Sequence, residues 1–232
     1  MGVFQDRHIV VTGGTGALGS AVVSALVEHG GVVHVPCLRG SDLDEHPLAS
    51  VDRVRLSGPI DLTEEASVEA YYEGLPSLWA SIQCAGGFQM SPLTETSAQD
   101  FERMHAMNAL SCFLCCREAT RSIRSGGEGG RLVNVGAMPA IHPVGGMTAY
   151  AASKAAVVNI TQSLAAELAP EGILVNGIIP SIMDTPANRA AMPDADHESW
   201  PRVEDIAEQI LAFVSPANRV TRGTLAQVLG ET

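Results

Sequence analysis

Short runs of β-branched and other apolar residues alternate along this chain with longer stretches whose apolar positions recur at helical spacing. The short runs predict strands at residues 8–13, 31–37, 53–56, 78–87, 129–137, 173–180 and 223–230. The longer stretches predict helices at residues 17–30, 64–75, 97–123, 148–172 and 203–215. Strands separated by such helices are typical of βαβ units. We therefore expect an α/β fold with a doubly wound parallel sheet of about seven strands and helices on both faces.

The size and charge of the chain narrow its class. No linker, repeat or low-complexity run divides the 232 residues, which favours one domain spanning residues 1–232. The formal charge of −12 and the isoelectric point near 4.9 oppose binding to nucleic acid and to anionic membrane surfaces. No stretch reaches the roughly 20 apolar residues of a membrane span, and the N-terminal segment lacks the features of a signal peptide. We expect a cytoplasmic protein that acts on a small-molecule substrate.

The cysteine pattern favours buried thiols over a metal site. The chain has five cysteines, with no paired spacing typical of metal ligands. Cys112, Cys115 and Cys116 are spaced to share one face of a helix, where we expect them to be buried, reduced and free of metal.

A glycine-rich segment, TGGTGALG, lies at residues 12–19, where the first predicted strand turns into the first predicted helix. Glycine lets the backbone turn tightly and approach a phosphate, and the start of a helix offers free N–H groups with a partial positive charge. In this position the segment predicts a dinucleotide-binding loop rather than an ordinary strand-to-helix turn. The expected cofactor contacts in it are Gly13, Thr15, Gly16, Ala17, Leu18 and Gly19.

The ends of the second and third predicted strands bear on the choice of cofactor. An acidic residue after the second strand would bind the ribose 2′-hydroxyl of NAD(H), but the chain has Cys37 there, with Arg39 close by. Without a carboxylate to repel a 2′-phosphate, the sequence favours NADP(H) over NAD(H). Asp61, next to Leu62, is either an acceptor for the adenine amino group or part of a helix start with Thr63.

Tyr150 and Lys154 stand four residues apart in the helix predicted at 148–172, so their side chains project from one face. Lys154 is the only lysine among the fourteen lysine and arginine residues of the chain. A nearby ammonium favours phenolate and is expected to lower the pKa of a tyrosine from about 10. An arginine fork would occupy the site differently and would not release its proton. This contrast favours a catalytic pair over an ordinary surface pair.

Five motifs together resemble the short-chain dehydrogenase/reductase family in order and separation: TGGTGALG, CAGG at 84–87, Asn108 in MNALSCF, YAASK at 150–154 and IIPSIMDT at 178–185. The resemblance implies a single-domain Rossmann fold, a homotetramer or homodimer, and hydride transfer between NAD(P)H and a carbonyl-like carbon. It also implies that Tyr150 donates the proton, that Lys154 holds the nicotinamide ribose, and that Asn108 anchors a water relay. The further cofactor contacts that it implies are Ala85, Gly86, Gly87, Tyr150, Lys154, Pro180, Ile182 and Thr185.

The chain departs from this family at the position thirteen residues before the tyrosine, where a serine usually helps to hold the substrate oxygen. Ala137 occupies that position and has no side-chain donor. Loss of one oxyanion donor can cost on the order of 10² to 10³ in rate, so either the substrate is easily reduced or another group substitutes. His142, in the following loop, is the candidate substitute, although a loop imidazole is more often structural.

The alanine at 137, the GALGS stretch and the run at 184–200 resemble the dihydropteridine reductases of the same superfamily. A quinonoid dihydropterin is a strong electrophile and needs less oxyanion stabilisation than a ketone, which would account for Ala137. Two features of this chain differ from those enzymes: the presence of Asn108 and the absence of an acidic residue near Cys37. The expected substrate is therefore a small activated carbonyl, imine or quinonoid compound, with a pterin-like compound among the candidates.

The segment at 186–202 follows the sixth predicted strand at the carboxyl end of the sheet, where such folds bind ligands. Its Pro, Asn and Asp content favours a short helix and loop that close over the substrate, with Met192 and Trp200 as apolar walls. The alternative is a surface connection in which Trp200 packs against the body of the protein.

Two functions fit these features. The first is an NAD(P)H-dependent reductase that acts through Tyr150 and Lys154. The second is a dinucleotide-binding redox sensor with little catalysis, for which Ala137 is the main support. The joint presence of Tyr150, Lys154 and Asn108 argues against the sensor, because a sensor needs no proton relay.

Overall fold

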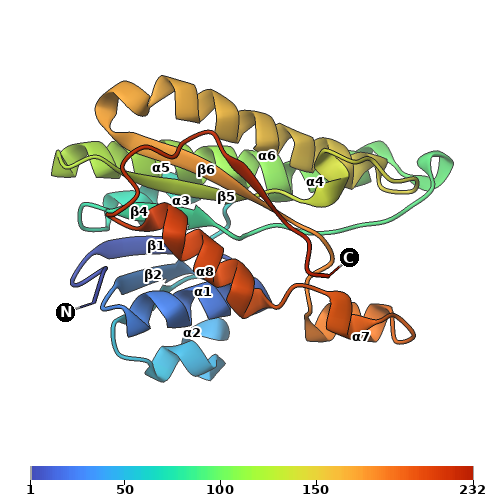
Figure 1. The fold of residues 1–232 in the computed structure, drawn as a ribbon, viewed down its shortest axis with the longest axis horizontal. Helices are drawn as coiled ribbons and strands as arrows, with labels where there is room; N and C mark the ends of the chain where they lie inside the picture. The colour runs from blue at the N-terminus through green and yellow to red at the C-terminus, as the bar shows by residue number, and fades with distance from the viewer. Residues whose placement is uncertain (1, 232) are drawn as a thin grey trace.

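A computed structural model describes residues 2–231 of the chain, without the side chains of Asp42 and Asp44. Within these residues, seven parallel strands form one sheet in the order β3-β2-β1-β4-β5-β6-β7 (Figure 1). The strands are β1 (His8–Thr12), β2 (Val32–Pro36), β3 (Val54–Ser57), β4 (Ala80–Gln83), β5 (Gly130–Val135), β6 (Ile173–Pro180) and β7 (Leu225–Val228). The predicted parallel sheet is confirmed. Its order reverses between β1 and β4, the kind of switch point at which such sheets bind ligands.

Helices cover both faces of the sheet, as predicted (Figure 1). One face packs against α1 (Ala17–Glu28) and α8 (Val203–Val214), with the short α2 (Asp42–Glu45) beside them. The opposite face packs against α3 (Glu65–Glu73), α5 (Ser111–Gly126) and α6 (Thr148–Glu167), with α4 (Ala98–His105) at one end of this layer. The remaining helix, α7 (Pro186–Ala191), lies close to the C-terminus.

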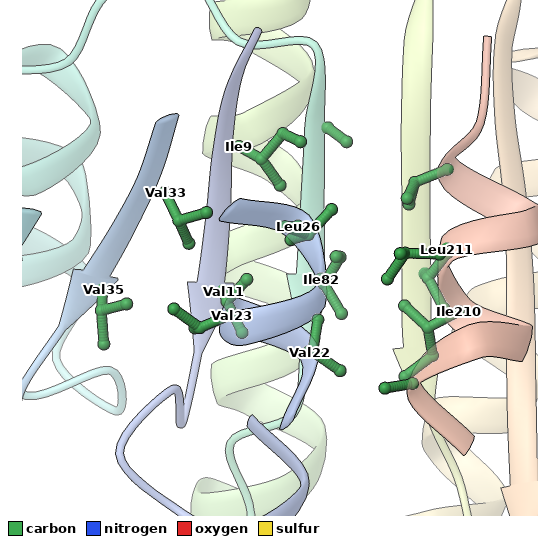
Figure 2. Close-up of a cluster of buried hydrophobic side chains, with 14 of the residues drawn as sticks. Ile9, Val11, Val22, Val23, Leu26, Val33, Val35, Ile82, Ile210 and Leu211 are labelled. Carbon is green, nitrogen blue, oxygen red and sulfur yellow. The ribbon is translucent and has the colours of Figure 1, made fainter. Parts of the chain in front are cut away.

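The strands are buried on both faces, so that successive side chains enter different layers. Ile9 and Val11 of β1 pack with Leu26 of α1 and Ile210 of α8 (Figure 2). Val10, between them in the sequence, packs on the other side with residues of α3, α5 and α6. Because both faces of the sheet are covered, the strands are continuous apolar runs in the sequence. The same packing fixes the positions of the strand ends, where the candidate site lies.

The region predicted as one helix at 97–123 consists of three elements: α4, a π-helical turn at Ala106–Leu110, and α5. A capping box of Ser97 and Asp100 fixes the start of α4. The π turn holds Asn108, and such insertions are frequent at functional sites. Apolar spacing could not predict the turn because the helices before and after it both keep the helical period.

Other elements also differ from the prediction. The sequence does not predict α2 or the 3₁₀ turn at Pro47–Ser50, because each is about one turn long and lacks apolar periodicity.

Cys112, Cys115 and Cys116 lie buried in α5, which confirms their shared face. Among residues 2–231, no group of three His, Cys, Asp or Glu side chains comes together as a possible metal site. In the same part of the chain, no helix is both long and apolar enough to cross a membrane.

Candidate active site

The loop between β1 and α1 lies against the end of β4. Gly13 has a positive φ of 64°, and a Cβ at this position would lie 2.8 Å from the Ala85 backbone. A Cβ at Gly19 would lie 2.1 Å from the Gly13 carbonyl oxygen, so both positions require glycine. Helix α1 starts after Gly16 without a side-chain cap and without an acidic residue in its first turn. Its first N–H groups can therefore bind an anion, and the loop fits a dinucleotide pyrophosphate.

Thr12 ties this loop to β4. Its hydroxyl oxygen accepts a hydrogen bond from the Ala85 N–H at 3.2 Å and donates to Gln83 Oε1 at 3.3 Å. These bonds hold the ends of β1 and β4 together beneath the loop. Of the six predicted loop contacts, four are partly or fully exposed and two are buried. The exposed ones are Gly13, Thr15, Gly16 and Ala17, and the buried ones are Leu18 and Gly19.

The residues predicted to bind the adenosine half follow β2 and β3. Cys37 is only 1% exposed, whereas Arg39 is exposed beyond it. Asp61 Oδ1 accepts hydrogen bonds from the Thr63 backbone N–H at 2.9 Å and from the Thr63 hydroxyl at 2.7 Å. This local turn corresponds to the helix-start interpretation of Asp61. Leu62 packs half-buried against the apolar layer of α3 and α5.

Asn108 links the segment after β4 to helix α6. Its side-chain oxygen accepts from the Gly87 N–H at 2.9 Å, and its amide donates to the Gly87 carbonyl at 3.0 Å and to Ser153 Oγ at 2.9 Å. Ser153 Oγ donates in turn to the Tyr150 carbonyl oxygen at 2.7 Å. Because Asn108 is 1% exposed, water does not compete for these bonds. The network fixes the start of α6 relative to the end of β4.

Lys154 is buried beside this network. Its Nζ donates to the Val135 carbonyl oxygen at 2.8 Å, and a Cβ placed on Gly86 would lie 3.3 Å from it. Burial lowers the pKa of Lys154 to about 8, because loss of water penalises the ammonium. The ammonium lies between the ends of β4 and β5 and has two more N–H donors besides the one bonded to Val135. These donors can bind a ribose hydroxyl.

Tyr150 lies one turn before Lys154 in α6, with its ring centroid 5.0 Å from that of Phe88 and the two rings inclined at 81°. Burial raises the pKa of Tyr150 to about 12. The expectation that Lys154 lowers this pKa is wrong for this structure, because the ammonium is directed at Val135 and desolvation acts on the phenol. Tyr150 therefore holds its proton at neutral pH, as a proton donor must.

Two of the residues predicted near the substrate follow β5. Ala137 is 6% exposed and comes directly before the 3₁₀ turn Met138–Ala140, which packs against α6. Its methyl group cannot donate a hydrogen bond. His142 is exposed in the next loop, where its backbone N–H donates to the Met138 carbonyl oxygen at 2.8 Å. The backbone of His142 is thus anchored while its imidazole is open to solvent.

The segment predicted as a lid, residues 186–202, contains α7 and a 3₁₀ turn at His197–Ser199. Trp200 is only 7% exposed, and its ring centroid lies 4.6 Å from that of His197. The Glu231 N–H donates to the Ser199 carbonyl oxygen at 3.0 Å, which joins residues before the C-terminus to this segment. Trp200 is thus largely buried, with the ring of His197 from the same segment against it. Met192 is half-buried at the end of α7.

The segment that follows β6 joins the same edge of the sheet. Pro180 ends the strand, Ile182 is 45% exposed, and Thr185 is buried at the start of α7. The Thr185 hydroxyl accepts from a backbone N–H in the first turn of α7 at 3.2 Å. Asp184 and Arg189 form a paired contact at 2.6 and 2.8 Å, which closes the turn around this cap.

Three residues of this site escape sequence reasoning: Thr12, Ser153 and Phe88. Ser153 lies three residues after Tyr150 in YAASK, so helical spacing places it near the same turn, but not against Asn108. Phe88 directly follows CAGG, and no periodicity or motif spacing in the sequence marks it. Their roles depend on contacts between distant parts of the chain.

Comparison with known proteins agrees with this geometry. A family model described as short chain dehydrogenase matches residues 7–196. The chain is 28% identical over 232 residues to a dihydropteridine reductase of Dictyostelium discoideum, covering 96% of this chain and 94% of that protein. It is also 28% identical over 214 residues to the cyclic-di-GMP-binding biofilm dispersal mediator protein of Escherichia coli (strain K12), covering 84% and 81% of the two proteins. The solved structure of ElxO with NADP bound matches with a TM-score of 0.89 and 20% identity, covering 97% of this chain and 98% of that one.

The parallel sheet with a glycine loop at its switch point is a dinucleotide-binding fold, and the family model and sequence relatives make the chain an oxidoreductase. The chain belongs to the short-chain dehydrogenase/reductase family, whose members use a nicotinamide cofactor and act on small molecules.

Proposed function

We propose that this protein reduces a small activated carbonyl, imine or quinonoid substrate with hydride from NAD(P)H, and that Tyr150 is the proton donor. The main support is the joint placement of three residues at one edge of the sheet. Asn108 is bonded to Gly87 and Ser153, Lys154 is buried one turn along α6, and Tyr150 begins that helix.

In the proposed reaction, the substrate gains a hydride at carbon, or at the equivalent position of a quinonoid ring, and a proton at oxygen or nitrogen. When bound, NAD(P)H supplies the hydride with its electron pair and is oxidised to NAD(P)⁺. Tyr150 gives its phenolic proton to the developing anion and regains a proton from solvent. Burial raises the pKa of Tyr150 to about 12, so the phenol is protonated at neutral pH and has a proton to give. Lys154 holds the cofactor ribose, and Asn108 anchors the water relay that returns the proton.

Because Ala137 has no hydroxyl group, the site favours substrates that need little stabilisation of a developing oxyanion. A single oxyanion donor is worth on the order of 10² to 10³ in rate, so an ordinary ketone would be reduced slowly here. A quinonoid or iminium compound is more electrophilic and develops less charge on oxygen. The similarity to a dihydropteridine reductase supports this class, with a pterin-like compound as one candidate.

We propose NADP(H) as the preferred cofactor. Arg39 is exposed after β2, and the nearby Cys37 carries no charge that would repel a 2′-phosphate. ElxO, which shares this fold, has been solved with NADP bound. The other proposed contacts with the cofactor are those predicted from the sequence, with Asp61 occupied in part by its bonds to Thr63.

Two further features of the proposed enzyme concern its outer segments. We propose that residues 186–202 close over the substrate, with Met192 on the inner side.

We also propose a homotetramer or homodimer, because Leu110 and Phe113 leave apolar surface exposed on one side of the α5 region, at 41% and 45%.

The alternative is a dinucleotide-binding redox sensor with little catalysis. The missing donor at Ala137 supports it, and so does the similarity to a biofilm dispersal mediator that binds cyclic-di-GMP. The buried network around Asn108 and Lys154 favours the reductase, because a sensor has no need to position a proton donor.

The test is steady-state oxidation of NADPH and of NADH, followed at the nicotinamide absorbance, with quinonoid dihydropterin, menadione, a cyclic imine and a simple ketone. Tyr150→Phe is assayed in parallel, and general acid catalysis predicts a fall of about 10² to 10⁴ in kcat. Tyr71→Phe is the matched control, because this tyrosine is buried in α3 and its hydroxyl has no hydrogen-bond partner among the described residues. Saturable cofactor binding without turnover of any of these substrates would favour the sensor.

A further inference from the structure

Phe88 is an exposed aromatic ring directly beside the proposed proton donor. It is 60% exposed, yet its ring centroid lies 5.0 Å from that of Tyr150 in an edge-to-face arrangement. Edge-to-face contact uses the rim of one ring against the face of the other, so most of the Phe88 surface is open to solvent. A large apolar side chain in such a position exposes surface that a flat ligand can cover.

Phe88 is held in place from both sides along the chain. Gly87 exchanges two hydrogen bonds with Asn108, at 2.9 and 3.0 Å. On the other side, the Gln89 side chain accepts a hydrogen bond from Arg103 of α4. Because both neighbours are anchored, Phe88 is presented in a fixed position relative to Tyr150 rather than on a free loop.

The same region carries further exposed apolar side chains on two loops that are joined. The Ser91 N–H donates to the Gly146 carbonyl oxygen at 2.8 Å, which connects the loop after β4 to the loop before α6. Met90 lies close to Gly146, since a Cβ placed on that glycine would be 3.1 Å from Met90 Cε. Met90 and Val144 are 59% and 54% exposed. Phe88, Met90 and Val144 thus expose apolar surface on these two joined loops, and we call the three residues the apolar rim.

Charge does not dominate this rim. Arg103 of α4 is linked to this loop through its hydrogen bond to Gln89. Its guanidinium lies 2.7 Å from the Asp100 carboxylate, which balances the charge locally. An apolar rim with a fixed aromatic ring favours a conjugated ring over a polyhydroxylated or strongly anionic compound.

We propose that Phe88 is a specificity-determining residue, and that its open ring surface stacks on a flat, conjugated ring of the substrate. This inference rests on the proposed reductase function and adds to it a substrate shape, namely planar quinones and related planar heterocycles. In this arrangement Tyr150 reaches the edge of the ring that carries the oxygen or nitrogen atom, while Phe88 fixes the plane of the ring.

Two vicinal diketones of different shape provide the test: phenanthrenequinone, which is flat and aromatic, and camphorquinone, which is a saturated cage. In Phe88→Leu, kcat/KM for phenanthrenequinone should fall about three- to tenfold, mainly through KM, while the value for camphorquinone changes less than about twofold. Phe88→Tyr should restore the wild-type preference. Phe101→Leu is the matched control, because Phe101 is an exposed aromatic residue of α4 that stacks on His105 instead.

Equal losses for the two diketones, or no loss for phenanthrenequinone, would overturn the role of Phe88 while the reductase function survives. If the wild-type protein turns over neither compound, calorimetric binding of phenanthrenequinone to the NADP⁺ complex decides the outcome. Binding that weakens in Phe88→Leu would keep the stacking role, whether or not the four substrates of the reductase test are turned over. No binding to the wild-type protein would overturn the stacking role.

Discussion

Lys154 Nζ donates a hydrogen bond of 2.8 Å to the carbonyl oxygen of Val135, the last residue of β5. The contact joins helix α6 to the sheet through a charged group that is only 7% exposed. One buried hydrogen bond does not repay the desolvation of an ammonium, so the structure maintains Lys154 at a cost in stability. Such a cost is common where a group serves function rather than folding.

Lys154→Met should therefore stabilise the fold while it removes activity. The lowering of the pKa of Lys154 from 10.5 to about 8 corresponds to about 3 kcal/mol of penalty near neutral pH. Part of it is offset by the bond to Val135, so we expect a net gain of about 1 to 2 kcal/mol in the free energy of unfolding of the cofactor-free protein. Denaturant titration measures this gain.

The gain should depend on pH in a defined direction. Between about pH 8 and pH 10.5, the folded protein has lost the Lys154 proton while the unfolded chain retains it, so the wild type becomes relatively more stable as pH rises. The advantage of Lys154→Met should shrink from pH 7 to pH 9.5. An advantage that is independent of pH, or a less stable variant at neutral pH, would contradict a charged and desolvated Lys154.

Gly86→Ala should damage the site without unfolding the protein. A Cβ at this position would lie 2.5 Å from Asn108 Oδ1 and 3.3 Å from Lys154 Nζ, so at least one of these side chains must move. A displaced Asn108 loses its bonds to Gly87 and Ser153, and we expect kcat to fall by about tenfold or more. Gly74→Ala is the control, because its nearest contact would be an ordinary 3.5 Å. Normal turnover in Gly86→Ala would show that the position of Asn108 does not matter for the reaction.

Arg39→Ala should weaken the binding of NADPH more than the binding of NADH. A guanidinium at the end of β2 would pair with the 2′-phosphate that only NADPH carries. We expect KM for NADPH to rise about tenfold and KM for NADH to change less than about twofold, as determined by steady-state kinetics. Arg219→Ala supplies the comparison, because Arg219 is also exposed but lies in the connection before β7. A wild-type protein that already prefers NADH would refute the assignment.

His34 should make the protein sensitive to mild acid. It is 7% exposed on β2, and its Nε2 lies 2.9 Å from Nδ1 of His8 on β1. Burial, followed by the positive charges of His8 and Arg55, lowers the pKa of His34 from 6.5 to about 4. The unfolded chain therefore binds this proton first as pH falls, and we expect the protein to lose about 2 kcal/mol of stability between pH 7 and pH 5.

His34→Asn should reduce this loss, and thermal unfolding at several pH values measures the difference. His142→Asn is the control, because that histidine is exposed. The carboxyl groups with lowered pKa values, those of Asp6, Asp100, Glu171 and Asp184, contribute mainly at lower pH. The same pH sensitivity in wild type and His34→Asn would exclude His34 as its source.

Much of the fold follows from local patterns in the sequence. Continuous apolar runs such as residues 173–180 identify buried parallel strands, because both faces of such a sheet are covered. TGGTGALG identifies the loop at the switch point, since glycine at 13 and 19 is a steric requirement of the backbone there. The spacing of Tyr150 and Lys154 places them on one helix face, because the helical period fixes that relation without reference to the rest of the protein.

The sequence by itself thus determined the sheet, the glycine loop and the helix face that carries Tyr150 and Lys154. Only the tertiary structure decided the π turn at Asn108, the burial of Trp200, the pKa of Tyr150 and the exposed position of Phe88. Hydrogen bonds of the site join groups far apart along the chain: Asn108 bonds to Gly87 across 21 residues, and Lys154 bonds to Val135 across 19. Local propensity specifies the elements, whereas desolvation and hydrogen bonding act only after packing has brought those elements together.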